Sequence, residues 1–171
     1  MTLLSWDKRL SVGPPSVDAQ HKLLIESLNE LHSAVMRGEG RNVVGLSLRT
    51  FLAYTRNHHT SEEALMAKVG YPDLSGHRAL HRELLGTIEG HLARLERGEG
   101  AVTSEFLHFL RDWLSNHIEK FDRAYVPWIL RYTTSQARAA TGLAGAGFAQ
   151  TSNESCEDEN NGAGLVSEAS S

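Results

Sequence analysis

Residues 58–81 read HHTSEEALMAKVGYPDLSGHRALH, and this stretch contains the end of one predicted helix and the start of the next. Apolar residues recur at helical spacing both before it and after it. Gly70, Pro72 and Asp73 interrupt that pattern, because glycine and proline end helices. The stretch therefore predicts two antiparallel helices joined by a short turn.

Each of these two helices carries a pair of potential metal ligands one turn apart, His58 with Glu62 and His77 with His81. Residues four apart advance by roughly 400° at about 3.6 residues per turn, so both side chains of a pair leave the same face. A single pair is a weak signal, because surface and core histidines are common. Two pairs on adjacent helices indicate a metal site more strongly.

The same periodic spacing predicts four helices in all, over residues 17–36, 43–69, 77–95 and about 103–132. Pro127 is expected to bend or end the last helix locally. The sequence Arg-Gly-Glu-Gly follows both the first and the third helix, which predicts similar hairpin loops. Because short connections favour antiparallel neighbours, we expect an all-α, up-down-up-down four-helix bundle over residues 1–132.

Residues 133–171 differ in composition from the bundle: they are rich in Ala, Gly, Ser, Asn and Glu and poor in large apolar residues. Such a segment buries too little apolar surface to offset the entropy of ordering, so a disordered tail is predicted, with a frayed helical stretch as an alternative for its first part. The net charge of the whole chain is -4, and removing the five acidic residues of the tail leaves about +1. This charge gives no indication of nucleic-acid binding.

The single cysteine, Cys156, cannot form an internal disulfide, so the fold needs no oxidising compartment. The first twelve residues contain no apolar run of signal-peptide length, and no stretch of the chain has the length and apolarity of a membrane span. We therefore expect a cytoplasmic protein that does not enter a membrane. Its 171 residues are a one-domain length, and a monomer is expected.

The first and last predicted helices add further ligand-type side chains, so that every helix contributes at least one, as in sites built in the core of a bundle. The full set has five imidazoles and two carboxylates: His21, His58, Glu62, His77, His81, His117 and Asp122. This number exceeds what one tetrahedral zinc ion takes. It suits two metal ions that share bridging ligands.

The order and spacing of these residues resemble the ligand signature of the hemerythrin family, in particular its bacterial members. The matching sequence is His21, His58-x-x-x-Glu62, His77-x-x-x-His81 and His117-x-x-x-x-Asp122. Four further phrases agree with the family: Asp18-x-Gln20-His21, Glu62-Glu63, Tyr71-Pro72, and Trp113 one turn before His117. The resemblance extends over residues 6–132.

The resemblance implies a non-haem centre of two iron ions per chain, joined by an oxo or hydroxo bridge. It assigns His77, His81 and His117 to one iron and His21 and His58 to the other. It assigns Glu62 and Asp122 a bridging role between the two irons. Counting donors then leaves one open position, at the iron of the two imidazoles, where dioxygen would bind. Reversible dioxygen binding, without enzymatic turnover, is the leading hypothesis.

Three other functions remain as alternatives. The same centre could act as a sensor of oxygen, nitric oxide or redox state, in which case the tail would respond to the state of the metal. A di-iron oxidase or peroxidase would require a channel of acidic residues or turnover with peroxide. A purely structural bundle with incidental histidines would bind no iron.

One spacing does not fit a regular α-helix. His117 and Asp122 are five residues apart, an advance of roughly 500°, so their side chains would diverge by about 140° on an ideal helix. A local π-type turn would bring both to one site, because its hydrogen bonds connect residues five apart. We therefore predict such a turn at this position.

Four residues near the predicted ligands are expected to line an oxygen pocket: Leu24, Ile25, His59 and Trp113. The family usually has an aromatic residue at the position of His59. Two interpretations of His59 are open, a solvent-facing histidine or a hydrogen-bond donor near bound oxygen. The remaining histidines, His32, His91 and His108, are interpreted as surface or interhelical residues.

Overall fold

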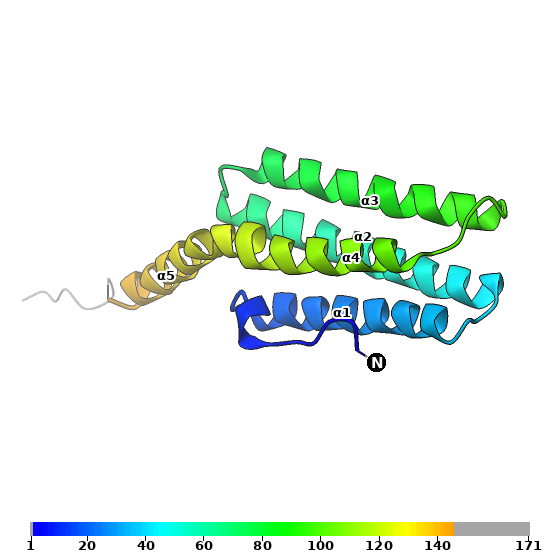
Figure 1. Cartoon of the computed structure of the whole chain (residues 1–171). Helices are drawn as coiled ribbons and strands as arrows, with labels where there is room; N and C mark the ends of the chain where they lie inside the picture. The colour runs from blue at the N-terminus through cyan, green and yellow to red at the C-terminus, as the bar shows by residue number, and fades with distance from the viewer. Residues whose placement is uncertain (1, 146–171) are drawn as a thin grey trace, which may run out of the picture. The chain divides into compact units, whose positions relative to one another are not determined.

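The computed structural model describes residues 2–145, and every regular element in this range is helical (Figure 1). Four antiparallel helical segments form a bundle, which confirms the predicted fold class. The elements are, in order, η1 Lys8–Leu10, α1 Pro15–Met36, α2 Arg41–Val69, α3 Leu74–Glu96, α4 Ser104–Asn116, the π-helical segment His117–Asp122, and α5 Arg123–Gly145. None of the described helices is long and apolar enough to cross a membrane.

The two Arg-Gly-Glu-Gly loops have the same conformation. Gly38 and Gly98 each follow a helix with a positive φ, of 68° and 76°, which glycine adopts without steric strain. In both loops the arginine side chain contacts the glutamate two residues later, Arg37 Nε with Glu39 Oε1 at 3.1 Å and Arg97 Nε with Glu99 Oε2 at 2.8 Å. The prediction of similar hairpins is confirmed.

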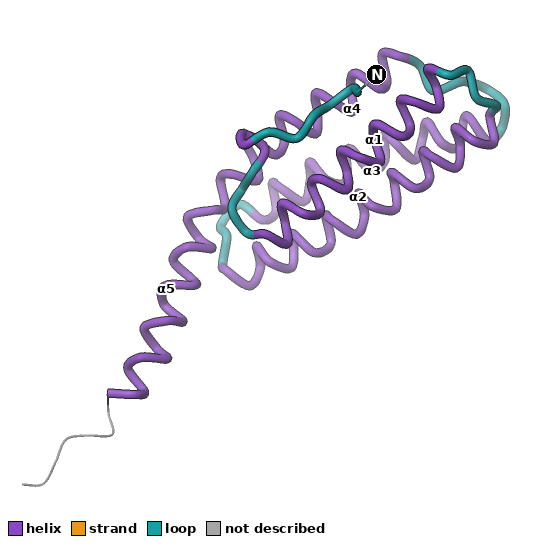
Figure 2. Tube along the Cα trace, turned by 90° about the horizontal axis from the view of Figure 1, so that it is seen from below, coloured by secondary structure: helices purple, strands orange, loops and turns teal. Residues whose placement is uncertain are grey.

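Apolar side chains from all four helices fill the bundle between the loops and the candidate site. Among the fully buried residues are Leu28, Leu31, Leu48, Ile88 and Leu107, each with 0% exposure. The N-terminal segment lies along α1 (Figure 2), where the Asn29 side chain hydrogen-bonds the backbone of Leu3 and Leu4. This packing fixes the positions of the helices relative to one another. It thereby also fixes the positions of the polar residues on them.

Two helix boundaries differ from the sequence-based expectations. α3 begins at Leu74, directly after Asp73 and three residues earlier than predicted, with the His77 amide bonded to the Asp73 carbonyl at 3.1 Å. Of the two effects expected of Pro127, a local bend or an end of the last helix, the end does not occur, because α5 continues through it to Gly145. Proline removes one backbone hydrogen-bond donor near the start of α5, but the residues on both sides of it are helical.

α5 extends beyond residue 132 into the predicted tail, and its residues 133–145 lie where the sequence allowed a frayed helical stretch. Gln, Arg and Ala are good helix formers, and adding residues to an existing helix avoids the unfavourable step of nucleation. The compact bundle unit reaches Gln136. Residues 146–171, including Cys156 and the acidic residues of the predicted tail, lie outside the described residues.

Candidate metal centre

Seven polar side chains from all four helical segments of the bundle converge in its interior, and they are the seven that the sequence predicted. His21 comes from α1, one pair of residues from α2, one pair from α3, and His117 and Asp122 from the π-helical segment. Each of the seven is at most 3% exposed. Water is therefore excluded from a set of groups that are normally solvated.

The π-helical segment explains how both ligand-type residues of the last helix reach the site. It begins at His117 and ends at Asp122, so the two residues stand at its ends, five positions apart. Hydrogen bonds between residues five apart widen the helix by about one residue per turn and bring these side chains to one face. The predicted π-type turn is confirmed.

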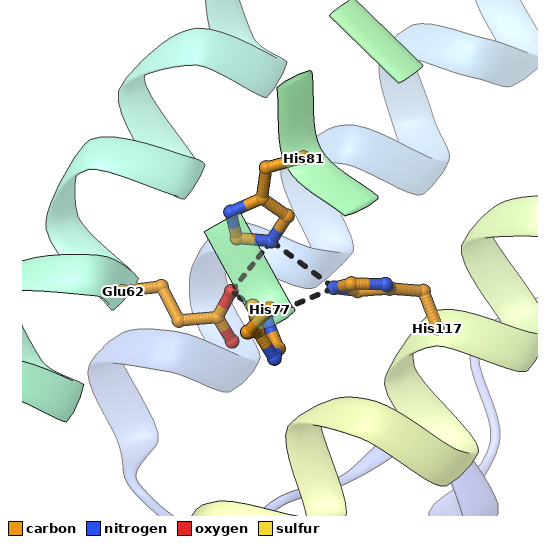
Figure 3. A group of neighbouring side chains, drawn as sticks. All are labelled: Glu62, His77, His81 and His117. Carbon is orange, nitrogen blue, oxygen red and sulfur yellow. Dashed lines mark hydrogen bonds and ion pairs between the residues drawn. The ribbon is translucent and has the colours of Figure 1, made fainter. Parts of the chain in front are cut away.

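The first cluster contains three imidazoles and one carboxylate, Glu62, His77, His81 and His117 (Figure 3). Nε2 of His117 lies 3.1 Å from Nε2 of both His77 and His81. Oε2 of Glu62 lies 3.4 Å from His77 Nε2 and 3.3 Å from His81 Nε2. Two imidazole nitrogens thus lie close to one carboxylate oxygen, and the nitrogen of His117 lies close to both of them, an arrangement that suits coordination of a cation.

The second cluster contains two imidazoles and two carboxylates, His21, His58, Glu62 and Asp122. His21 Nε2 lies 3.2 Å from Asp122 Oδ2, and His58 Nε2 lies 3.6 Å from Glu62 Oε2. The two rings are close, with centroids 4.7 Å apart and an edge-to-face angle of 72°. In each cluster the potential ligand atoms lie within 4.8 Å of one another.

The two carboxylates connect the clusters. Glu62 belongs to both. The oxygens of Asp122 are divided between them, because Oδ1 lies 3.0 Å from His117 Nε2 and 3.4 Å from His77 Nε2, whereas Oδ2 faces His21. Two adjacent clusters that share carboxylates in this way fit a dimetal site.

Comparison with known families agrees with this geometry. A profile described as the Hemerythrin HHE cation binding domain matches residues 13–129, a range that contains all seven residues of the two clusters. The chain belongs to the hemerythrin family. The resemblance inferred from the ligand spacing is thereby confirmed.

Individual hemerythrins cover most of the bundle. A bacteriohemerythrin of Methylococcus capsulatus is 34% identical over 128 residues, which are 74% of this chain and 97% of that protein. One of Stenotrophomonas maltophilia is 33% identical over 138 residues, 81% of this chain and 89% of that protein. A crystal structure of wild-type hemerythrin superimposes with a TM-score of 0.70 at 34% identity, and the match covers 73% of this chain and 96% of that one.

Several buried polar atoms of this hemerythrin site have no hydrogen-bond partner. They are both ring nitrogens of His21, Oε2 of Glu62, and both oxygens of Asp122. An unpaired buried polar atom is unfavourable by about 1–3 kcal/mol, and more if it is charged. Because Nε2 of His21 and the three carboxylate oxygens belong to the two clusters, cations bound there would give these atoms partners. The residues present therefore fit a dimetal centre.

The charges of the site are coupled. Burial alone would raise the pKa of Glu62, but contacts with His77 and His81 hold it well below its ordinary value. Burial would lower the pKa of His77, yet the Glu62 carboxylate raises it. Burial lowers the pKa of His58 to about 4, in spite of the Glu62 charge, so this ring is neutral at neutral pH. Ionised carboxylates and a neutral imidazole are the forms that bind metal.

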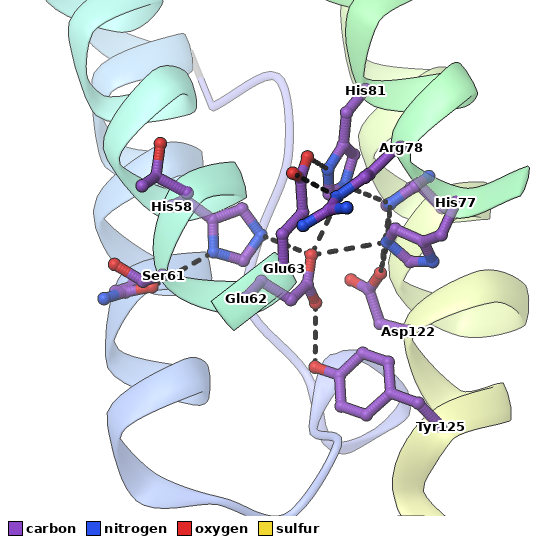
Figure 4. A network of polar contacts seen from close by, with 12 residues as sticks. His58, Ser61, Glu62, Glu63, His77, Arg78, His81, Asp122 and Tyr125 are labelled. Carbon is purple, nitrogen blue, oxygen red and sulfur yellow. Dashed lines mark hydrogen bonds and ion pairs between the residues drawn. The ribbon is translucent and has the colours of Figure 1, made fainter. Parts of the chain in front are cut away.

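Three further contacts orient the ligand-type residues (Figure 4). His58 Nδ1 lies 3.2 Å from Gln20 Oε1, His81 Nδ1 lies 2.9 Å from Glu63 Oε1, and the Tyr125 hydroxyl donates to Glu62 Oε1 at 2.8 Å. Sequence reasoning assigned no role to Tyr125. Its position three residues after Asp122, one turn along the helix, was the available signal.

A small, mostly apolar cavity lies beside the clusters. It is lined by Leu24, Phe51, Thr55, His58, His59, Leu84, Leu110, Trp113, Leu114 and His117. Of the four predicted pocket residues, Leu24, His59 and Trp113 line it. Ile25 is buried but lies towards the N-terminal segment, among Leu4, Trp6 and Lys22. Leu24 and Ile25 leave α1 on opposite sides of His21, by roughly 60° and 40°, and the cavity is on the Leu24 side.

His59 is 3% exposed, so the interpretation of a solvent-facing histidine is wrong. Its ring stacks on His81, with centroids 3.5 Å apart and an interplanar angle of 2°, and its Nδ1 has no hydrogen-bond partner. Burial lowers its pKa far below the ordinary value, so the ring is neutral. Trp113 stacks similarly on His117, with centroids 4.3 Å apart. Flat contacts of this kind hold the two imidazoles in place.

Proposed function

We propose that this hemerythrin binds dioxygen reversibly at a centre of two non-haem iron ions. The observation that carries the proposal is the unequal donor set of the two clusters. One cluster has three imidazoles and the other has two, while Glu62 and Asp122 face both clusters. Two metal ions of the same kind would therefore differ in coordination, and the one with fewer imidazoles would retain a position for an external ligand.

The site residues would hold the two irons as follows. His77, His81 and His117 bind one iron, His21 and His58 bind the other, and Glu62 and Asp122 reach both. When bound, ferrous iron would supply the electrons and the ligand position that dioxygen requires. A nitrogen-rich donor set favours this metal over calcium or magnesium, which prefer oxygen ligands.

The protein groups around the cavity support binding without turnover. The cavity lining is mainly apolar, and it includes Leu24 and Leu110 but no carboxylate. Such a lining admits a small apolar ligand and disfavours water. Its polar members are Thr55 and three imidazoles, of which the His59 ring is uncharged. Among residues 2–145, no acidic side chain lines this cavity to supply protons to a ligand there.

The test is to reduce the purified iron-loaded protein without oxygen, admit oxygen, and follow the visible spectrum over several cycles of deoxygenation. Two irons per chain and a new absorption band that disappears and returns in each cycle are expected. Irreversible oxidation in the first cycle would instead favour a redox sensor or an oxidase, and turnover of added peroxide a peroxidase. A chain that binds no iron would contradict the proposal.

We further propose that the protein acts as a monomer in the cytoplasm; the single cysteine, which can form no internal disulfide, supports the second part. Sedimentation of the iron-loaded chain at several concentrations tests the first part. A mass that rises with concentration would contradict it.

A further inference from the structure

The two clusters of the site differ in the groups that contact the outer ring nitrogens of their imidazoles, which are the nitrogens that point away from the cluster. In the cluster of three imidazoles, the outer nitrogen of His81 contacts the carboxylate of Glu63. In the cluster of two, the outer nitrogen of His58 contacts the uncharged amide of Gln20, and the outer nitrogen of His21 has no partner. Of these contacts, only the one between Glu63 and His81 places a carboxylate against a histidine, and it belongs to the cluster of three imidazoles.

The contact between Glu63 and His81 is well placed to orient the ring. Glu63 Oε1 lies 2.9 Å from His81 Nδ1, and its other oxygen accepts from Arg78 Nε at 3.0 Å (Figure 4). The Glu63 side chain is 24% exposed and that of Arg78 is 44% exposed. Arg78 thus holds the carboxylate from the solvent side while His81 lies on the inner side, where it is 1% exposed.

This contact selects the tautomer of His81. An ionised carboxylate can only accept a hydrogen bond, so Nδ1 of His81 carries the hydrogen. The lone pair is then on Nε2, the atom that faces Glu62 and His117 at 3.3 Å and 3.1 Å. A carboxylate behind a histidine also makes the ring a stronger metal donor, because it stabilises the positive charge that the ring gains on coordination.

We propose that Glu63, held by Arg78, is a positioning residue that makes the cluster of three imidazoles the tighter of the two metal sites, so that it fills first. The inference rests on the proposed function in one respect, that each cluster holds a metal ion. Glu63 itself touches neither cluster's converging atoms and acts only through His81. Gln20 has the corresponding, weaker effect on the second cluster through His58.

The experiment is a calorimetric titration of the full chain, depleted of metal, with Co²⁺ as the probe. Cobalt accepts imidazole and carboxylate ligands and does not need oxygen or reductant. The wild type is expected to bind two equivalents in two steps. Glu63→Ala should weaken the first step by about 10–100-fold, the range for outer partners of metal ligands, and leave the second step within about threefold.

Two further variants separate charge from orientation. Glu63→Gln keeps a hydrogen-bond acceptor but removes the charge, so its loss in the first step should be smaller than that of Glu63→Ala. Gln20→Ala should weaken the second step and not the first. A pair of variants that act on opposite steps cannot be explained by general destabilisation of the bundle.

The matched control is Glu89→Gln. Glu89 on α3 pairs with Arg56 on α2 at 2.8 Å, so this pair joins the same two helices as Glu63 and Arg78 but contacts no imidazole. The change should lower thermal stability about as much as Glu63→Gln, while both cobalt steps stay as in the wild type. Circular dichroism checks that each variant keeps its helical content.

The outcomes distinguish this inference from the proposed function. If the wild type binds two equivalents and Glu63→Ala does not weaken the first, or weakens only the second, the role of Glu63 is wrong and the dimetal site stands. If the wild type binds no cobalt and no iron, the dimetal proposal itself fails. An equal effect of Glu63→Gln and Glu89→Gln on cobalt binding would also overturn the role of Glu63.

Discussion

The same four helices build two unlike halves of one bundle. Towards the Arg-Gly-Glu-Gly loops the interior is apolar, and Leu31, Leu48, Ile88 and Leu107 have no exposed surface. Towards the turn between α2 and α3 the interior holds the seven ligand-type residues, several with unpaired polar atoms. We call these the apolar half and the site half.

The difference shows how a small bundle keeps a buried polar site. Burial of apolar surface stabilises by about 25 cal/mol per Å², whereas burial of unpaired polar atoms destabilises. The apolar half therefore supplies the folding free energy that the site half lacks without metal. It follows that changes in the two halves should affect different measurements: metal binding in the site half, and unfolding in the apolar half.

The largest effect is expected from the carboxylate that both clusters share. Glu62→Gln removes a charge that contacts His58, His77 and His81. The cobalt affinity of both sites should fall by more than the roughly 10–100-fold expected for outer partners. Metal analysis after dialysis should find fewer than two ions per chain. Retention of two ions per chain would show that Glu62 does not connect the clusters. The control is Glu89→Gln, which removes a surface carboxylate and should leave cobalt binding unchanged.

The apolar half should respond in the opposite way. Ile88→Ala leaves a cavity in a fully buried position, so the free energy of unfolding should fall by about 2–5 kcal/mol. Denaturant titration measures this loss, and the number of metal ions per chain should stay at the wild-type value. Leu46→Ala is the control, because Leu46 is 62% exposed and its change should stay within about 0.5 kcal/mol. Loss of metal from a still folded Ile88→Ala chain would show that the halves are not separable.

The smallest effect is expected at His59, which lies where the two halves meet. His59→Phe keeps a flat ring against His81 and removes a buried nitrogen that has no partner. The free energy of unfolding should rise by about 1 kcal/mol, because an unsatisfied polar atom is lost. The oxygenated protein should also oxidise more slowly, since a hydrogen-bond donor leaves the cavity. An unchanged oxidation rate would remove His59 from any role near bound oxygen.

Most of the fold and the membership of the site could be predicted from the sequence. Helical periodicity and glycine signals defined the four helices, because both act over a few residues. The i, i+4 pairs on α2 and α3 had to share a face, since that follows from helix geometry alone. Even the π-helical segment was predictable, because no regular helix brings His117 and Asp122 together.

Other features depended on tertiary contacts. The environment of His59 is decided by the position of His81 on a neighbouring helix, which no local pattern specifies. The role of Tyr125 is decided by a hydrogen bond to Glu62, 63 residues away in sequence. The side of α1 that faces the cavity, which separates Leu24 from Ile25, depends on the rotation of that helix in the bundle.

The physical reason for this division is the distance along the sequence between the residues that interact. The sequence by itself determined which helices form and which side chains leave each helix in the same direction, because backbone geometry repeats every turn. Only the tertiary structure decided which of those side chains meet, which ring stacks on which ligand, and that Glu63 contacts His81 while Gln20 contacts His58. Those outcomes depend on the distance and rotation between helices, and packing of side chains distant in sequence sets both.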